Sequence, residues 1–220
     1  MKKVKIKSFE IWIDVLVLAM IWLFLFTYFK PELIFSDTTV SGGDMGSHNY
    51  LAKYMKESLA QGRIIGYSHD WYGGLPMFQF YFPLSYVMMA LLSTIIHANI
   101  AFKLMTIFGT FIMPLCTYVA FRIFDFRFPM PAIAAAMVLP FLFLQSNSMY
   151  GGNIPSSLAG VFSFSIGMAL SIVFIASLYK GIRTKKMLAF NVILLGIIAL
   201  FHIIPIITIA LSSVFFLRKD

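Results

Sequence analysis

Asp44 and His48 are two residues whose types and spacing suit acid–base chemistry. They lie four residues apart in the segment SGGDMGSHNYLAKYMKESLAQGR, residues 41–63, and two glycines directly precede the aspartate. A carboxylate within hydrogen-bonding reach of a hydroxyl group can act as a general base. An aspartate before a helix can equally serve as its N-cap. The spacing alone leaves both interpretations open, because a lone Asp–His pair does not define a catalytic site.

A second polar group consists of His69, Asp70 and Trp71. It precedes a Gly-Gly turn and a dense aromatic run in YSHDWYGGLPMFQFYFPLSY, residues 67–86. Aromatic side chains at this density suit the head-group level of a bilayer, or a wall that stacks on a sugar ring. His69 and Asp70 are adjacent and point apart on any regular element, so solvated turn residues are the alternative interpretation.

His202 and Lys103 are ionisable residues within apolar segments. An ionisable group at membrane depth is a candidate functional residue, although His202 can also be a hydrogen-bonded packing residue. Lys103 can extend towards lipid head groups or hold a lipid phosphate. The single cysteine, Cys116, lies in an apolar run, which excludes a disulfide framework and a thiolate metal site. The sequence has no P-loop, no Rossmann glycine motif and no HExxH motif.

The composition is that of an integral membrane protein. Of the 220 residues, 60% are hydrophobic and only 12% are charged, and the mean hydropathy is +0.87. Soluble domains have about a quarter of their residues charged. The net charge of +8 would suggest nucleic acid in a soluble protein. Here the basic residues cluster at the ends of apolar segments, so membrane topology explains them and no nucleic-acid partner is expected.

Six apolar stretches are the candidate membrane segments. They are Ile11–Phe29, Pro83–Ile96, Ile100–Phe121, Ala132–Leu144, Leu158–Tyr179 and Met187–Leu217. The last is too long for one crossing and has His202 and Pro205 in its middle, which favours two short helices that turn near His202 over one kinked helix.

The positions of the basic residues decide which segments cross. Lysines and arginines cluster before the first stretch, after Phe121, after Tyr179 and at the chain end. The positive-inside rule places all four clusters on the cytoplasmic side. This holds only if Pro83–Ile96, which is short and begins with proline, is a re-entrant or interfacial helix.

These arguments predict an all-α, polytopic protein of the cell membrane with about six transmembrane helices. The N-terminus is cytoplasmic, and Ile11–Phe29 is an uncleaved helix because the run is longer than a typical signal-peptide core. The loop over residues 30–99 is extracytoplasmic and contains the juxtamembrane helices. Within it, the sequence predicts an amphipathic helix from Ser47 or His48 to about Ala60, with Ser47 as N-cap.

The order of these segments resembles the GT-C superfamily of membrane glycosyltransferases. A first helix is followed by a long outer loop that opens with Gly-Gly-Asp and continues into an amphipathic helix. More narrowly, GGDMGSHNYLAKYMKESLAQGRIIGYSHDWYGGLPMFQFYFPLSY is similar to the membrane family called 6-pyruvoyl-tetrahydropterin synthase-related, as are GGNIPSSLAG and the ALFH that ends at His202. The soluble pterin synthases use a histidine-bound zinc, and nothing here supplies those ligands. The resemblance covers nearly all of residues 1–220 and implies a GT-C-like transmembrane domain.

The resemblance also implies a reaction. The donor would be a polyprenyl-phosphate-linked sugar at the outer leaflet, and the acceptor would be extracytoplasmic. By position, Asp44 would deprotonate or orient the acceptor, while Lys103 and His202 would neutralise the leaving phosphate. The remaining substrate-binding residues would be His48, His69, Asp70 and Trp71.

Two departures from the superfamily pattern lead to further expectations. Metal-dependent members have an acidic motif in the next outer loop, and QSNSMYGGNIPSS has no Asp or Glu. No metal site and no cofactor are therefore expected. GT-C enzymes are also usually longer, which predicts an additional membrane subunit or a further C-terminal region.

Two other function classes stay open. A non-catalytic membrane scaffold could keep the same fold. A transporter or flippase component is less favoured, because the sequence has neither an internal repeat nor a path of ionisable residues at the bilayer midplane.

Overall fold

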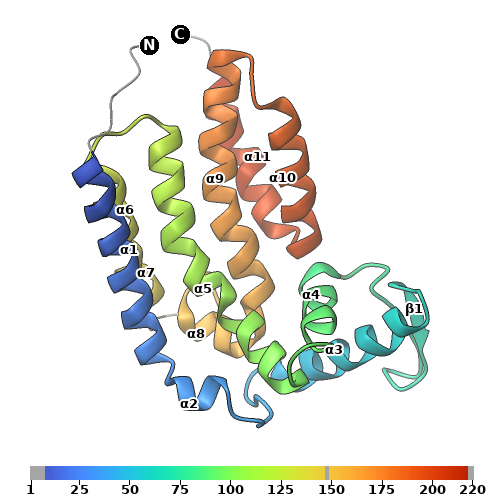
Figure 1. The fold of residues 1–220 in the computed structure, drawn as a ribbon. Coiled ribbons are helices and arrows are strands. Elements are labelled where there is room, and N and C mark those ends of the chain that lie inside the picture. The colour runs from blue at the N-terminus through green and yellow to red at the C-terminus, as the bar shows by residue number, and fades with distance from the viewer. Residues whose placement is uncertain (1–7, 147–148, 218–220) are drawn as a thin grey trace.

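The protein is a bundle of long helices with a smaller helical layer across one end (Figure 1). The computed structural model describes residues 8–146 and 149–217. The bundle comprises α1 (Ser8–Tyr28), α5 (Ala98–Ile123), α6 (Met130–Ala136), α7 (Val138–Leu142), α9 (Phe162–Thr184), α10 (Leu188–Phe201) and α11 (Ile204–Leu217). The end layer comprises α2 (Pro31–Ile34), α3 (Met45–Ala60), β1 (Gly66–Ser68), β2 (Leu75–Met77) and α4 (Leu84–Leu92). Two short elements, α8 (Ile154–Ser156) and the π-helical turn η1 (Ser157–Val161), lead into α9.

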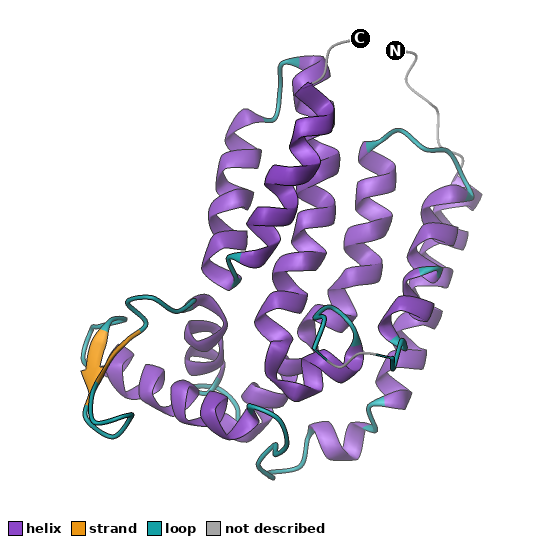
Figure 2. Ribbon diagram, turned by 180° about the vertical axis from the view of Figure 1, so that it is seen from behind, coloured by secondary structure: helices purple, strands orange, loops and turns teal. Residues whose placement is uncertain are grey.

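The start of α1 and the end of α11 lie at the end of the bundle opposite α3 and α4 (Figure 1). The two strands pair antiparallel, with Gly66 opposite Met77, and form a small hairpin beyond α3 (Figure 2). The sequence analysis did not anticipate this hairpin, because the strands are only three residues each.

Three helices of the described chain are long and apolar enough to cross a bilayer. They are Ser8–Tyr28, Ala98–Ile123 and the combined helix Ile154–Thr184. Three shorter apolar helices, Met130–Leu142, Leu188–Phe201 and Ile204–Phe216, accompany them. At 1.5 Å per residue each shorter helix is about 20 Å long, against a hydrocarbon thickness of about 30 Å. The predicted total of six crossings therefore stays a prediction.

The segment Met187–Leu217 forms two helices, as the sequence favoured. His202 has an extended backbone (φ −168°, ψ 143°) between α10 and α11. Pro205 is the second residue of α11, where its missing N–H is not needed. The segment Pro83–Ile96 contains only the nine-residue α4, about 14 Å long, which is too short to cross a bilayer.

Two other helices differ from their predicted extents. The stretch Ala132–Leu144 is broken after Ala136, because Pro140 in α7 has no N–H to donate back to the preceding turn. The long helix expected from Leu158 becomes regular only at Phe162, because Gly160 has φ +122° and interrupts it. Both breaks depend on a single residue inside an otherwise apolar run.

Two hydrophobic cores hold the layers together. One lies within the bundle and includes Leu25, Met113, Leu142, Ala169 and Ile198. The other joins the end layer to α5 and α9. Its fully buried members include Met45, Met55, Met77, Tyr86 and Phe162. The second core fixes α3 and α4 on the bundle.

A buried carboxylate links α1 to α5 within the bundle. The side chain of Asp14 on α1 is 1% exposed and accepts a hydrogen bond of 2.8 Å from the Tyr118 hydroxyl on α5. The Arg122 guanidinium lies 3.9 Å from the same carboxylate oxygen. This contact and a hydrogen bond of 2.9 Å from Trp22 Nε1 to the Phe111 carbonyl both join α1 to α5.

We predict that Asp14 and Tyr118 are energetically coupled. A double-mutant cycle with Asp14→Asn and Tyr118→Phe, measured by SDS titration in micelles, should give about 0.6 kcal/mol, as for hydrogen bonds between transmembrane helices. The matched control replaces Tyr118→Phe with Tyr28→Phe on α1, which should be additive with Asp14→Asn. A coupling of zero for the Asp14–Tyr118 pair would show that this contact does not stabilise the helix pair.

Candidate functional site

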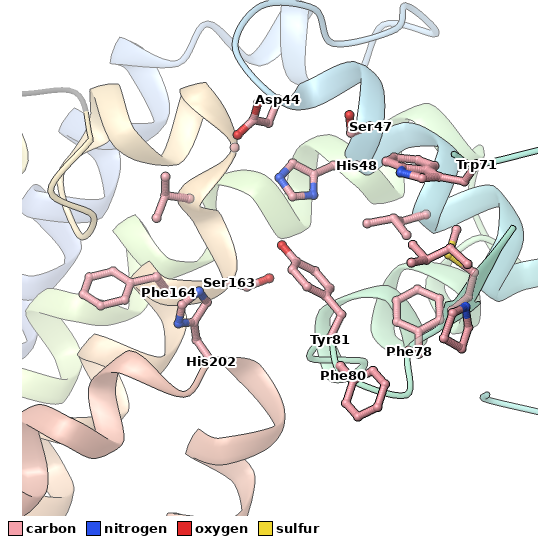
Figure 3. A pocket seen from close by; sticks show the side chains of 16 residues that line it. Asp44, Ser47, His48, Trp71, Phe78, Phe80, Tyr81, Ser163, Phe164 and His202 are labelled. Carbon is pink, nitrogen blue, oxygen red and sulfur yellow. The ribbon is translucent and has the colours of Figure 1, made fainter. Parts of the chain in front are cut away.

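The cavity that contains Asp44 lies where the end layer meets the bundle. It has a volume of about 470 Å³ and is called the Asp44 cavity below. The start of α3, the segment from Trp71 to Tyr81, the start of α9 and the turn between α10 and α11 surround it (Figure 3). Its polar lining residues are Asp44, Ser47, His48, Trp71, Tyr81, Ser163 and His202. Elements far apart in the sequence thus build one site.

Asp44 occupies the N-cap position of α3, but its side chain makes no capping hydrogen bond. Its backbone N–H donates instead to the Ala159 carbonyl of η1, at 2.9 Å. The predicted N-cap, Ser47, lies inside the helix, which begins at Met45. The helix starts earlier than expected because the contact with η1 fixes the backbone at Asp44. The carboxylate is exposed at the edge of the cavity and is not used to cap the helix.

Two glycines allow this close contact. Gly43 has φ +50°, and a Cβ atom there would overlap the Ala159 carbonyl oxygen. Gly160 has φ +122°, and a Cβ there would lie 2.9 Å from His48 Nε2 and 3.0 Å from Asp44 Cβ. Both positions therefore need a residue without a side chain. Gly43 and Gly160 therefore allow the same close contact, one from the start of α3 and the other from the irregular start of α9.

His48 is buried below Asp44 and joins α3 to α4. Its Nδ1 lies 2.6 Å from the Tyr86 hydroxyl, and its ring packs edge-on against Phe162. Burial lowers the pKa of His48 from its usual value of 6.5, and the nearby Asp44 carboxylate opposes this effect only in part. His48 is accordingly neutral at pH 7, and its role in the geometry is to hold α3 against Tyr86.

Aromatic side chains form much of the cavity wall. Trp71, Phe78, Phe80 and Tyr81 all line the cavity (Figure 3). Phe80 is 82% exposed, so a flat apolar ring is available at the mouth. Burial raises the pKa of Tyr81, which keeps its phenol protonated and able to donate a hydrogen bond. A carboxylate and aromatic rings that border one cavity suit a ligand that has both hydroxyl groups and apolar ring faces.

The structure brings four of the seven predicted site residues to this cavity: Asp44, His48, Trp71 and His202. The His202 ring packs between Phe82 and Phe164, with ring centroids 4.6 Å and 5.6 Å away. Its Nδ1 accepts a hydrogen bond of 3.3 Å from the Ile204 N–H. His202 thus enters the cavity from the turn between α10 and α11.

His69 and Asp70 lie elsewhere in the end layer. They line a separate pocket of about 260 Å³, together with Tyr50, Tyr54 and Tyr67. The Tyr50 ring packs against Trp71, with centroids 5.1 Å apart, so this pocket adjoins the Asp44 cavity across Trp71. The pair expected beside Asp44 therefore lies on the far side of the tryptophan.

Lys103 is not among the described residues that line the Asp44 cavity. Its ammonium donates to the Leu33 carbonyl at 2.7 Å, to the carbonyl and hydroxyl of Ser36 at 2.9 Å each, and to the Thr38 hydroxyl at 2.7 Å. These contacts hold the chain after α2 on the start of α5. The lysine is engaged by the protein itself at the position expected to face a phosphate.

Sequence analysis missed Tyr81, Tyr86, Gly160 and Ser163. Tyr81 and Tyr86 lie within the aromatic run that the sequence analysis singled out. Nothing in that run distinguished these two tyrosines from the other aromatic residues. Gly160 ends the GGNIPSSLAG segment that supports the family resemblance, but no role was predicted for it. Ser163 carried no signal, because one serine near an apolar helix is common. Among the described residues, no group of three His, Cys, Asp or Glu side chains is placed to hold a metal ion.

Comparison with known proteins identifies one family. The profile described as "6-pyruvoyl-tetrahydropterin synthase related domain; membrane protein" matches residues 78–219. The match covers the aromatic run from Phe78, the start of α9 and His202, whereas Asp44, His48 and Trp71 precede it. No curated protein and no solved structure matches the chain.

We predict that Gly43→Ala disrupts the docking of α3 on η1. The new Cβ would overlap the Ala159 carbonyl, so the thermal midpoint in detergent should fall, with a loss of about 1–3 kcal/mol in stability. Gly42→Ala is the matched control: Gly42 also has a positive φ (+99°), but its Cβ would meet nothing within 4 Å. Equal effects of the two substitutions would mean that the contact with Ala159 is not the reason for the glycine.

We also predict that this region is destabilised by acid through His48. Because burial lowers the pKa of His48 below 6.5, the unfolded chain binds more protons than the folded chain as the pH falls below 6.5. The thermal midpoint should therefore fall between pH 7.5 and pH 5.5. His48→Gln should reduce this dependence, while His69→Gln, at an exposed position in the same loop, should preserve it. If the thermal midpoint of His48→Gln depended on pH as strongly as that of the wild type, His48 would not be the source of the acid destabilisation.

Proposed function

Because this chain belongs to the 6-pyruvoyl-tetrahydropterin synthase-related family of membrane proteins, we propose that the Asp44 cavity is the site of a membrane glycosyltransferase. The enzyme transfers a sugar from a polyprenyl-phosphate donor to an extracytoplasmic acceptor. The family description names no reaction, so the proposal depends on the cavity and on the resemblance of the outer loop to GT-C enzymes.

The observation that carries the proposal is the state of the Asp44 carboxylate. It is at a helix N-cap but accepts no capping hydrogen bond, and it borders a cavity with an aromatic wall. Aromatic faces stack on sugar rings, and the carboxylate is available to a hydroxyl group of the ligand. A cavity of about 470 Å³ lies within the usual range for small-molecule sites, about 300–1,000 Å³.

The proposed chemical step is a displacement at the anomeric carbon of the donor sugar. The acceptor oxygen forms a bond to that carbon while its proton passes to Asp44. The bond between the anomeric carbon and the phosphate oxygen breaks, and the electron pair leaves with the polyprenyl phosphate. No oxidant, reductant or cofactor is needed for this balance.

His202 is the polar group that this proposal assigns to the leaving phosphate. It lines the cavity near the start of α9 and acts as a hydrogen-bond donor rather than as a fixed cation, whereas the Ser163 hydroxyl, which also lines the cavity, donates to the Ser85 hydroxyl at 2.8 Å. His48 is a positioning residue, since it acts through its contacts with Tyr86 and Phe162. The tyrosine-lined pocket at His69 and Asp70 adjoins the cavity and would take a further sugar of the acceptor.

The proposed topology places this reaction outside the cytoplasm. The chain crosses the cell membrane several times, its N-terminus is cytoplasmic, and the end layer with Asp44 lies at the outer surface. The Asp14–Arg122 pair then lies at the inner end of the bundle. The polyprenyl chain of the donor remains in the bilayer, where a further membrane subunit would act together with this chain.

A direct test uses the Asp44→Asn variant. Purified protein in detergent is incubated with polyprenyl-phosphate glucose or polyprenyl-phosphate mannose, with water available to accept the sugar, and released polyprenyl phosphate is measured by mass spectrometry. The wild type should release it from at least one donor, and Asp44→Asn should be slower by about 100-fold or more, since a general base contributes 10²–10⁴-fold. Binding of the intact donor should be unchanged.

Glu32→Gln is the matched control. It removes an exposed carboxylate from the same outer loop, outside the lining of the Asp44 cavity. Its release rate should equal that of the wild type. Full activity in Asp44→Asn would end the assignment of this residue as the base.

A non-catalytic membrane scaffold of the same fold is the second candidate function. One observation favours it: no lysine or arginine is among the described residues that line the Asp44 cavity. A phosphate that leaves during sugar transfer is usually met by a cation. The wild-type protein would then neither bind polyprenyl phosphate nor release it from either donor.

A further inference from the structure

A second large cavity lies on the other side of α3. It has a volume of about 640 Å³, and α3, the second half of α4 and the start of α5 enclose it. At about 100° of rotation per residue, Ser47 and Leu51 face one way from α3. Ala52, Lys56 and Ala60 face the opposite way, into this second cavity. The lysine cavity, as we call it, is therefore distinct from the Asp44 cavity.

The floor of the lysine cavity is apolar. Met89 and Ala90 of α4 and Phe102 of α5 form it, and all three are buried members of the core of the end layer. Polar residues surround the opening, including Asn49 and Asn99. The cavity thus has an apolar bottom and a polar rim, which suits an amphipathic ligand better than a fully polar one.

The charges at the rim leave one lysine without a carboxylate. Lys53 pairs with Glu57 at 4.0 Å on the surface of α3. Lys56 Nζ contacts only a carbonyl, that of Ser93, at 3.5 Å, and forms no salt bridge within the described part of the chain. Its ammonium is therefore available to an anion at the mouth of the cavity.

Exposed apolar side chains adjoin the same opening. Leu91 is 59% exposed and Ile95 is 84% exposed, and they flank Ser93 of the rim. In a chain with helices that can cross a bilayer, apolar side chains so exposed at the end of the bundle are suited to the lipid interface. The opening of the lysine cavity then lies where the head group and the first part of an acyl chain are available.

We propose that the lysine cavity binds an anionic membrane lipid. The lipid phosphate pairs with Lys56, and one acyl chain lies over Met89, Ala90 and Phe102. The ligand class follows from charge complementarity at the rim and from the apolar floor. Because α3 separates the two cavities, this site is independent of the sugar-transfer reaction proposed for Asp44, and either proposal can fail without the other.

The test is native mass spectrometry of the full-length protein in detergent micelles. Phosphatidylglycerol should bind as a retained adduct, and phosphatidylcholine, whose head group has no net charge, should bind several-fold less. Lys56→Gln should weaken phosphatidylglycerol binding about fivefold, the contribution expected of one lysine near a lipid phosphate. Arg63→Gln is the matched control, since it removes a positive charge from the same loop away from the cavity.

A second variant tests the cavity by shape. Ala98, an exposed lining residue at the start of α5, is replaced by phenylalanine, which should block the opening while Lys56 stays in place. Circular dichroism and size-exclusion chromatography check that both variants fold. Equal adducts in the wild type, Lys56→Gln and Ala98→Phe would overturn the site. Displacement of phosphatidylglycerol by millimolar inorganic phosphate would overturn the assignment of the acyl chain.

Discussion

The hydrogen bond from the Asp44 N–H to the Ala159 carbonyl is the contact on which the site depends. It joins the start of α3 to the irregular start of α9, although 115 residues separate the two in sequence. Glycine at positions 43 and 160 makes the approach possible, since a side chain at either would meet the other segment. Because the backbone is held in this way, the Asp44 carboxylate is not needed to stabilise the helix. The Asp44 carboxylate, which makes no capping hydrogen bond, is therefore available to a ligand.

The helix α3 serves two cavities because of its amphipathic pattern. One face presents Ser47, His48 and Leu51 to the Asp44 cavity, and the opposite face presents Lys56 to the lysine cavity. Met55, which is fully buried, anchors the helix between them in the core of the end layer. Burial also keeps His48 neutral, so its hydrogen bond to Tyr86 is a fixed structural link at pH 7. A rigid helix thus positions groups of different chemistry at fixed separations.

Much of the helical framework follows from composition, but its interruptions do not. The apolar stretches and the turn at His202 were predictable, because apolar length and Pro205 are local features. The break between α6 and α7 and the late start of α9 were not, because each depends on how one proline or glycine fits its neighbours. Lys103 was expected to face a phosphate, and its hydrogen bonds to Ser36 and Thr38 became visible only in three dimensions.

The sequence by itself determined that the chain is a largely helical membrane protein and that the loop around Asp44 is its one long polar segment. Hydrophobic length and the density of glycine and aromatic residues are properties of short segments, so they need no tertiary information. Only the tertiary structure decided that Asp44, Trp71 and His202 share a cavity while His69 and Asp70 lie beyond it. The physical reason is that a cavity is made of surfaces from distant segments. Their approach is set by packing and by the absence of a side chain at two glycines.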